Sequence, residues 1–303
     1  MTETIAQHRV LHRRATVELS MCGQHALFAA RVGDWSWDTV SRQSGFDVLS
    51  ARGRGGKPAY LAFSYLHIQA GAHLHPLGLA IGDELDVRSQ AYNCGAGTVA
   101  VHHRIAPAEA RNRPDPNQMH IRTLNHWVHP GGHDGNPALA AAEPHGFDAA
   151  VLPPLPEGRA LRAMLSRARR SGSLARHFQP DLRLTAPEQS VVYTIDPSRD
   201  LNAAGIVYFA AYYSFIDSAL LAHWRRLGRP DAAFLSRHVL DHKLCYHANA
   251  HPDTTLRITT RLLADPTRPD EDVADVLVHD HADGRLLAMS AIRQTSYSSA
   301  RSR

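Results

Sequence analysis

The chain has 303 residues, of which 44% are hydrophobic and 20% charged, proportions typical of a globular protein with one or two apolar cores. No segment approaches the roughly 20 consecutive apolar residues of a membrane-spanning helix, so we expect no membrane association. Residues 1–14 are basic but lack a following apolar segment, which argues against a secretory signal. The three cysteines form no CxxC pair, which fits a reducing cytoplasm and argues against a disulfide framework or zinc ribbon.

The formal net charge is +4, and much of the excess lies in one mid-chain cluster of arginines: Arg159, Arg162, Arg167, Arg169, Arg170 and Arg176. A nucleic-acid-binding surface would interleave aromatic side chains with the cations, so we expect no nucleic-acid partner. A local cluster instead suits a ligand that carries phosphate groups, or an acidic partner surface. The alternative interpretation is a solvated basic helix with no ligand.

In chain order, the first half begins with a short predicted strand at residues 17–20. A helical pattern that contains tryptophans follows at residues 23–45. Strand patterns then occur at residues 60–70, 83–93, 97–105 and 119–128. Residues 130–185 are rich in glycine and proline and predict a connection between two units, in which residues 158–170 form a basic helix.

The second half repeats this order, with a strand pattern at residues 190–195 and a long helical pattern at residues 205–227. Apolar residues recur in this helix at spacings of three and four, namely Ile206, Phe209, Tyr213, Ile216, Leu220 and Trp224. Gly228 and Pro230 are typical of a helix end. Four further strands are predicted at residues 239–248, 255–264, 272–281 and 285–297, with Asp283-Gly284 as a hairpin turn.

A strand, a long helix and several antiparallel strands therefore occur twice, which predicts an α+β protein with one helix wrapped by each sheet. We expect an N-terminal domain at residues 15–130, a linker with the basic helix at 131–185, and a C-terminal domain at 186–298.

Residues 200–212 read DLNAAGIVYFAAY and resemble the start of the long helix in hot-dog thioesterases of the 4-hydroxybenzoyl-CoA type. The resemblance implies a tandem, or double, hot-dog fold, with amide groups at the helix N-terminus binding the thioester carbonyl oxygen. In this interpretation Gly205 lets the backbone approach the thioester. Asn202, a candidate catalytic residue, stands where those thioesterases have a catalytic aspartate. Its amide can hydrogen-bond a thioester or a carboxylate but is neither a general base nor a nucleophile. Plain hydrolysis is therefore disfavoured, and we interpret Asp200 as a capping residue.

Five segments of the first half resemble a second family, the bifunctional acyltransferase/decarboxylases of leinamycin-type polyketide pathways (LnmK): MCGQHALF at 21–28, GDW at 33–35, PAYLAFSY at 58–65, HP at 75–76 and GD at 82–83. The similarity extends over nearly the whole chain, including the double hot-dog arrangement. It implies that methylmalonyl-CoA is the substrate, that a tyrosine carries the acyl group, and that propionyl is delivered to an acyl carrier protein after decarboxylation. It implies no cofactor besides the CoA thioester substrate.

Two tyrosines are candidates for that nucleophile, Tyr65 and Tyr60. On a regular strand Leu61, Phe63, Tyr65 and His67 share one face, and this bulky face should pack toward a helix. We therefore favour Tyr65 over Tyr60 as the catalytic residue, with His67 as its neighbour at the substrate. The alternative for either residue is a core tyrosine with a hydrogen-bonded hydroxyl.

The remaining candidate substrate contacts are Gln24 and His25, which precede the first helix as Asn202 precedes the second, and Arg169 in the basic cluster. Cys22 is more typical of a small buried residue than of a nucleophile. The histidine pairs, such as the pair at residues 102–103, lack a third ligand at a spacing suited to a metal site, so we expect no metal.

The sequence thus favours an enzyme of polyketide metabolism that takes an acyl-CoA and an acyl carrier protein as partners. A hot-dog acyl-thioester hydrolase or dehydratase is an alternative, and so is a non-catalytic module that binds acyl carriers. Hot-dog units usually pair edge to edge, which a tandem chain can do internally, and a further homodimer is possible.

Overall fold

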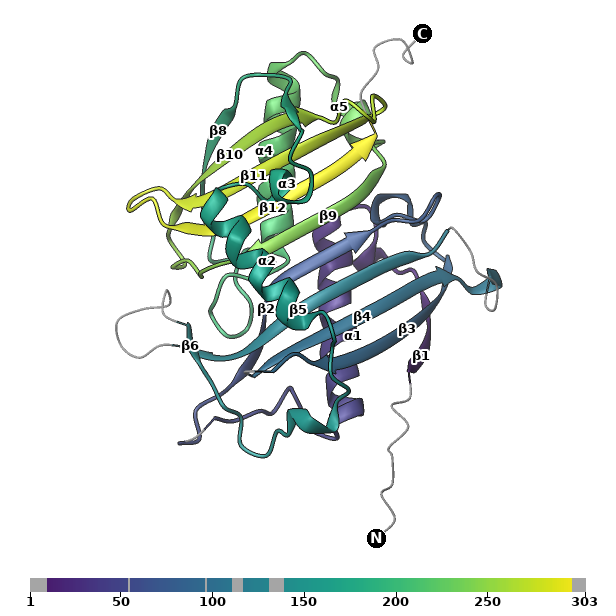
Figure 1. Cartoon of the computed structure of the whole chain (residues 1–303), viewed down its shortest axis with the longest axis vertical. Coiled ribbons are helices and arrows are strands. Elements are labelled where there is room, and N and C mark those ends of the chain that lie inside the picture. Colours follow the sequence, from purple (N-terminus) through teal and green to yellow (C-terminus); the bar gives the residue numbers. More distant parts are fainter. Residues whose placement is uncertain (1–9, 54, 96, 111–116, 131–138, 296–303) are drawn as a thin grey trace.

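The computed structural model describes residues 10–53, 55–95, 97–110, 117–130 and 139–295. Within these residues, twelve strands form one antiparallel sheet. Two long helices, α1 (His25–Ser44) and α4 (Ala211–Arg226), cover one face of the sheet, and two helices of the mid-chain connection cross the other face (Figure 1). No helix in the described part of the chain combines the length and apolar character needed to span a membrane.

The N-terminal half of the sheet wraps around α1. Its strands lie in the spatial order β1 (Leu11–Thr16), β3 (Glu84–Asn93), β4 (Thr98–Pro107), β5 (Met119–Pro130) and β2 (Tyr60–Gln69). A short strand, β6 (Leu139–Ala141), pairs with the end of β5.

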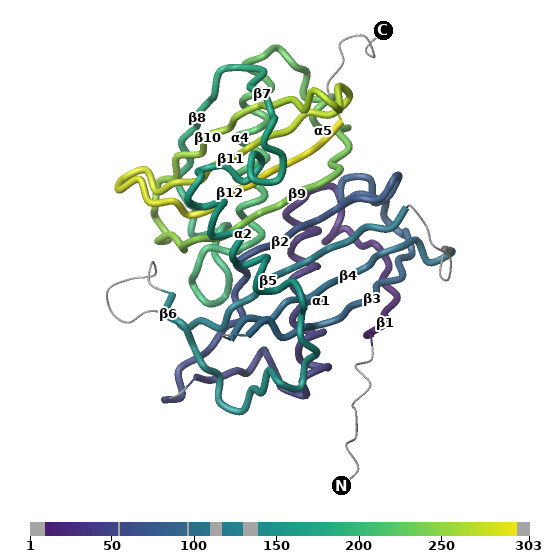
Figure 2. Tube along the Cα trace, viewed as in Figure 1, coloured from purple at the N-terminus to yellow at the C-terminus, as the bar shows by residue number. Residues whose placement is uncertain are grey.

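The C-terminal half repeats that order around α4, with β8 (Gln189–Thr194), β10 (Thr255–Ala264), β11 (Glu271–Asp280), β12 (Leu286–Thr295) and β9 (Val239–Tyr246). Two short elements complete it, β7 (Arg183–Leu184), which also pairs with β10, and α5 (Asp231–Leu235). The last strands of the two repeats, β2 and β9, pair antiparallel at the centre of the sheet (Figure 2). The predicted α+β architecture of two sheets, each wrapping a long helix, is therefore confirmed.

The apolar stripe predicted for the second helix forms the core of its half. Tyr213, Ile216, Leu220 and Trp224 are almost fully buried, and they belong to one hydrophobic cluster that also contains Phe28 of α1. A single apolar core thus extends beneath both halves, which explains why the two helices pack side by side rather than as separate domains.

The basic helix α2 (Gly158–Ser171) and the short helix α3 (Leu174–Phe178) lie on the opposite face of the sheet, across the junction of the halves (Figure 1). The buried side of α2 includes Leu165 and Ala168, which belong to a second cluster with Tyr65 of β2 and Met289 of β12. The predicted domain boundary after residue 130 and the predicted end at 298 lie outside the described residues.

One predicted element of the first half is wrong. Residues 17–20 do not form a strand, because Leu19–Met21 is a short 3-10 helix and the edge strand β1 lies earlier, at Leu11–Thr16. Side chains of β1 alternate between exposed and half-buried positions and include three basic residues. A charged edge strand of this kind lacks the apolar signature from which strands are predicted.

Candidate active site

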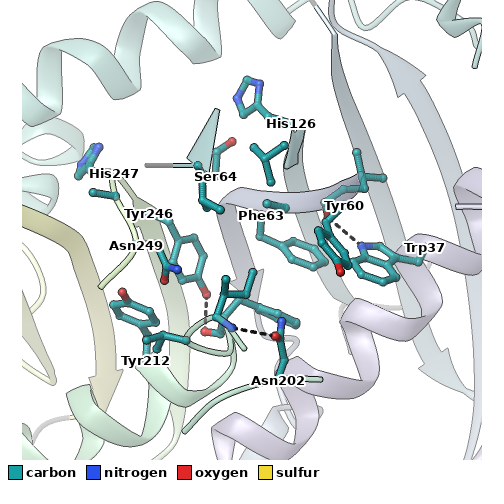
Figure 3. Close-up of a pocket in the computed structure, with 18 of the residues that line it drawn as sticks. Trp37, Tyr60, Phe63, Ser64, His126, Asn202, Tyr212, Tyr246, His247 and Asn249 are labelled. Carbon is teal, nitrogen blue, oxygen red and sulfur yellow. Dashed lines mark hydrogen bonds between the residues drawn. The ribbon is translucent and has the colours of Figure 1, made fainter. Parts of the chain in front are cut away.

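A cavity of about 420 Å³ lies where the two halves of the sheet separate. The pairing of β2 with β9 covers Tyr65 to Gln69 and Asp241 to Cys245, whereas residues 60–64 and 246–249 lie beyond it and line the cavity. The remaining walls come from α1, from β5 and β6, from the end of α2 and from the segment that leads into α4. Figure 3 shows Trp37 of α1, His126 of β5 and Asn202 of the segment before α4. Both halves and the linker therefore contribute to one site.

Strand β2 changes the direction of its side chains within the cavity wall. Phe63 is paired with Asn125 of β5 and Tyr65 with the adjacent Leu124, so Ser64 is an extra residue that forms a β-bulge. Phe63 consequently packs in the core beneath the long helices, whereas Tyr65 is buried on the other face, under α2. The prediction that Tyr65 shares a face with Phe63 is wrong, because a bulge shifts the two-residue alternation by one position.

Tyr65 and His67 do not line the cavity. Burial, and then the nearby Asp241 carboxylate, raise the pKa of Tyr65 well above its usual value, which disfavours a phenolate nucleophile. The Nε2 atom of His67 lies 2.9 Å from Oδ2 of Asp241, and Lys243 donates to the same carboxylate. Although burial opposes it, the hydrogen bond with His67 and the charge of Lys243 lower the pKa of Asp241 to about 2. These residues form a largely buried polar group outside the cavity.

Tyr60, the less favoured candidate, lines the cavity. No hydrogen-bond partner for its hydroxyl is found among the residues that the structure describes, so the group is available to a ligand. Trp37 of α1 is a further lining residue, and its Nε1 donates to the carbonyl oxygen of Leu61 at 2.9 Å (Figure 3). The order of preference for the nucleophile is therefore reversed in favour of Tyr60.

Asn202 lines the cavity from the C-terminal half. Its Oδ1 accepts hydrogen bonds from the backbone N–H groups of Ala204 at 3.0 Å and Ile206 at 3.3 Å, which holds residues 202–206 in a tight turn. The Nδ2 group has no partner among the described residues. Asn202 thus combines a fixed side chain with one N–H₂ donor available to a ligand in the cavity.

The predicted helix start at Gly205 is wrong. Helix α4 begins at Ala211, and Gly205 lies in the preceding turn with a φ of 70°. A Cβ at Gly205 would meet no atom within 4 Å, and the residue is exposed, so the glycine serves the left-handed turn and not a close approach to the thioester. Residues 201 and 207 form an antiparallel bridge, which explains why the helix starts later than its apolar spacing predicts.

Asp200 has the structural role predicted for it. This buried carboxylate accepts hydrogen bonds from the Tyr193 hydroxyl at 2.5 Å, the Asp196 backbone N–H at 2.9 Å and Arg199 Nε at 3.1 Å. It is not among the residues that line the cavity.

The residues before the first helix lie away from the cavity. Gln24 is the exposed N-cap residue of α1, and its side chain makes no capping hydrogen bond. His25 is buried, and its Nδ1 lies 3.0 Å from Oδ2 of Asp217 on α4, whose Oδ1 accepts from Arg237 at 2.7 Å. The segments before the two long helices are therefore not equivalent. The prediction that Gln24 and His25 contact substrate at a site matching that of Asn202 is not supported.

Arg169 of α2, His126 and His247 contribute a guanidinium group and two imidazoles to the cavity wall. Burial, and then Arg169, lower the pKa of His247 to about 4, and burial followed by Arg162 lowers the pKa of His126. Both imidazoles are therefore neutral near pH 7, and Arg169 supplies the positive charge. Among the described lining residues there is no aspartate or glutamate.

Sequence reasoning missed most of the aromatic wall and the residues after β9. Phe209, Tyr212, Tyr246 and Asn249 all line the cavity, and the Tyr246 hydroxyl donates to the Phe209 carbonyl oxygen at 2.9 Å (Figure 3). Phe209 and Tyr212 are part of the recognised 200–212 segment, but a strand end such as Tyr246–Asn249 has no signal in the sequence. Within the described residues, no group of three potential metal-ligating side chains is found.

Known structures share the architecture of both halves. The chain is similar to an acyl-ACP thioesterase from Bacteroides thetaiotaomicron, with 12% identity, a TM-score of 0.55, and coverage of 94% of this chain and 97% of that one. It is also similar to the 12:0-ACP thioesterase from Umbellularia californica, with 12% identity, a TM-score of 0.57, and coverage of 94% and 93%. At such identities the likeness shows the fold alone. No curated protein sequence matches the chain.

A family model described as the LnmK N-terminal Hot Dog Fold domain matches residues 12–176, which is more than half of the 303-residue chain. That range contains α1, strands β1 to β6 and most of the mid-chain connection. The chain therefore belongs to the LnmK hot-dog family, and its two halves form a double hot-dog fold.

Proposed function

We propose that this protein decarboxylates a malonyl-type acyl-CoA and transfers the acyl group to an acyl carrier protein. One observation carries the proposal: the cavity between the halves presents a tyrosine hydroxyl, an asparagine amide and an arginine, and its described lining contains no carboxylate. Family membership, and the fold shared with acyl-ACP thioesterases, support a thioester as the substrate.

The charged and the apolar parts of the cavity wall suggest how the thioester lies in the cavity. Arg169 is at the end of α2, and other arginines of this helix, including Arg159, Arg167 and Arg170, are exposed on the surface. Phosphate groups of coenzyme A, or acidic side chains of a carrier protein, would bind there because opposite charges attract. The acyl group would then lie among Phe63, Phe209 and the other apolar lining residues.

The lining suits decarboxylation better than hydrolysis. When the C–C bond of the malonyl group breaks, CO₂ leaves and the electron pair forms an enolate on the acyl carbonyl oxygen. The α-carbon then takes up a proton from water. An N–H donor aimed at that oxygen stabilises the enolate, and the free Nδ2 of Asn202 can act as this donor. The apolar wall disfavours the charged carboxylate of the substrate and so favours its loss as CO₂. Because the described lining has no acidic residue, no protein carboxylate repels the substrate or activates a water molecule for hydrolysis.

Acyl transfer requires a nucleophile, and Tyr60 has the free hydroxyl in the cavity. Attack of its oxygen on the thioester carbonyl forms an aryl ester and breaks the C–S bond, and the phenolic proton goes to the departing thiolate of coenzyme A. After decarboxylation, the carrier's pantetheine thiol attacks the ester, which transfers the acyl group and returns the proton to Tyr60.

The proposal is tested by incubating the protein with methylmalonyl-CoA and a phosphopantetheinylated acyl carrier protein from a polyketide synthase, followed by intact-mass spectrometry of the carrier. Propionyl-carrier is the expected product. Free acid with unloaded carrier would identify a hydrolase instead, and an unchanged substrate that binds tightly would identify a non-catalytic binding module. Methylmalonyl-carrier would show that transfer occurs without decarboxylation.

A further inference from the structure

Two phenylalanines, one from each half, pack against each other and form part of the apolar wall of the cavity. The ring of Phe209, which precedes α4, lies 4.2 Å from the ring of Phe63 on β2 between centroids, at an interplanar angle of 31°. Both residues line the cavity (Figure 3). Their position therefore determines how much room remains for the acyl group.

The far edge of the Phe209 ring contacts helix α1 at Gly33. A Cβ built at Gly33 would lie 2.6 Å from Cζ and 3.0 Å from Cε1 of Phe209, which is closer than carbon atoms approach each other without bonding. Gly33 is buried in the middle of α1 and does not have a positive φ. Its backbone therefore does not require glycine, and glycine weakens a helix interior. The presence of glycine at position 33 is explained by the space that it leaves for the Phe209 ring.

We propose that Gly33 determines acyl-group size selectivity by seating the Phe209 ring against α1 and so keeping it out of the cavity. The inference rests on the proposed function only in assigning the acyl group to this cavity. A methyl group at position 33 must displace the ring, and Phe63 already occupies the space on its stacked face. The two rings then move into the cavity that both of them line, and the space beside the acyl α-carbon shrinks.

The test compares Gly33→Ala with the double variant Gly33→Ala/Phe209→Leu and with Phe209→Leu alone. Leucine lacks the distal ring atoms that the methyl group added at position 33 would meet, so the double variant relieves the clash. Relative kcat/KM values are measured for malonyl-, methylmalonyl- and ethylmalonyl-CoA. We expect Gly33→Ala to lower the ethylmalonyl-to-malonyl ratio by about tenfold or more, in line with the effect of one methylene in a tight pocket. The double variant should restore the ratio, and Phe209→Leu alone should raise it.

A loss of activity that is uniform across the three substrates, or a ratio that the double variant fails to restore, would overturn the proposal. Circular dichroism and thermal melting identify any variant that does not fold, and the Phe209→Leu variant then still tests the direction of the change. If the natural protein does not turn over malonyl thioesters, the proposed function fails. The affinities of the same variants for acetyl-, propionyl- and butyryl-CoA, measured by calorimetry, then test the selectivity. The proposal requires Gly33→Ala to weaken binding of the larger acyl groups more than that of acetyl-CoA.

Discussion

His25 and Asp217, 192 residues apart in sequence, form a partly buried pair that joins the central helices of the two halves, with Nδ1 of His25 3.0 Å from Oδ2 of Asp217. Arg237 donates to the other carboxylate oxygen at 2.7 Å, and the His25 and Arg237 side chains are almost fully buried. Although burial opposes it, His25 and then Arg237 lower the pKa of Asp217. This arrangement indicates that His25 is a structural link between the halves rather than a substrate contact.

Asp217→Asn should destabilise the protein strongly and leave substrate binding unchanged. Removing the carboxylate leaves Arg237 buried without its ion-pair partner, which we expect to cost about 3 kcal/mol of the free energy of unfolding. Chemical denaturation measures this change. Asp38→Asn is the matched control, because Asp38 pairs with Arg13 and Arg42 near the surface and should cost less than about 1 kcal/mol. An unchanged stability together with a raised KM would instead show that His25 acts on substrate.

Tyr60→Phe should abolish acyl transfer, and Tyr65→Phe should not. The first substitution removes the free hydroxyl in the cavity, and we expect kcat to fall by about a hundredfold or more. The second removes a hydroxyl under α2, outside the cavity, so activity should remain within a few-fold of the natural protein. Mass spectrometry of a trapped acyl-protein after brief incubation with methylmalonyl-CoA locates the ester. Acyl transfer that survives Tyr60→Phe at full rate would contradict a tyrosyl intermediate at this position.

The fold could be predicted from the sequence because its repeated elements carry local periodic signals. Most strands and the first long helix lie within a few residues of the expected ranges, whereas α4 begins at Ala211 and not at Gly205. The errors occur where a specific hydrogen bond or an inserted residue overrides a local period. Ile206 and Phe209 continue the spacing of the α4 stripe, yet the Asn202 side chain holds that segment in a turn.

The site was harder to predict than the fold, because it depends on one inserted residue and on long-range pairing. Nothing in residues 60–69 marks Ser64 as a bulge, since a two-residue period fits the whole segment equally well. The His25–Asp217 pair joins residues from different repeats, and only the packing of α1 against α4 brings them together. The position of Asn202 in the cavity wall could be predicted because the residue belongs to a contiguous sequence motif, although the helix after that motif starts later than expected.

Asn202→Asp should reduce decarboxylation while preserving the turn. An aspartate oxygen can still accept from the Ala204 and Ile206 backbone N–H groups, but the second oxygen replaces the Nδ2 donor. Loss of a donor to the enolate should lower the decarboxylation rate by about 10²–10³-fold. Release of ¹⁴CO₂ from carboxyl-labelled methylmalonyl-CoA measures that step, and free coenzyme A without carrier loading reports any hydrolysis gained. If Asn202→Asp decarboxylates normally, another group must stabilise the enolate.

Arg169→Gln should weaken binding of the CoA thioester with little effect on kcat. Arg169 is the arginine among the described cavity-lining residues, and a hydrogen bond from a charged group to phosphate contributes about 1.5–3 kcal/mol. We therefore expect KM for methylmalonyl-CoA to rise by about tenfold, and the difference from the natural protein to diminish at high salt. The adjacent Arg170→Gln is the control, because Arg170 donates to Ser166 on α2 and does not line the cavity. Equal effects of the two substitutions would indicate a diffuse charge effect instead of a phosphate contact.

The free energy of unfolding should fall as the pH decreases below about 6.5, and His103 should account for part of this dependence. His103 is buried between Ser36 and Ser89, whose hydroxyls lie 2.9 and 2.8 Å from its ring nitrogens. Burial, and then Arg13, lower its pKa to about 3. Between the unfolded and folded pKa values only the unfolded chain binds this proton, so the site removes about 1.4 kcal/mol of stability per pH unit.

His103→Gln should therefore reduce the slope of stability against pH by one proton between pH 6 and about 4, even though the variant is less stable overall. Urea denaturation at several pH values measures this slope. The control is His12→Gln on the exposed side of β1, which should leave the slope unchanged because that side chain stays in water. The stability of the variant should still depend on pH, because other buried histidines remain. One of these is His242, whose pKa is lowered by burial to about 3. A slope that His103→Gln leaves intact would show that the folded protein binds the proton at this site as readily as the unfolded chain.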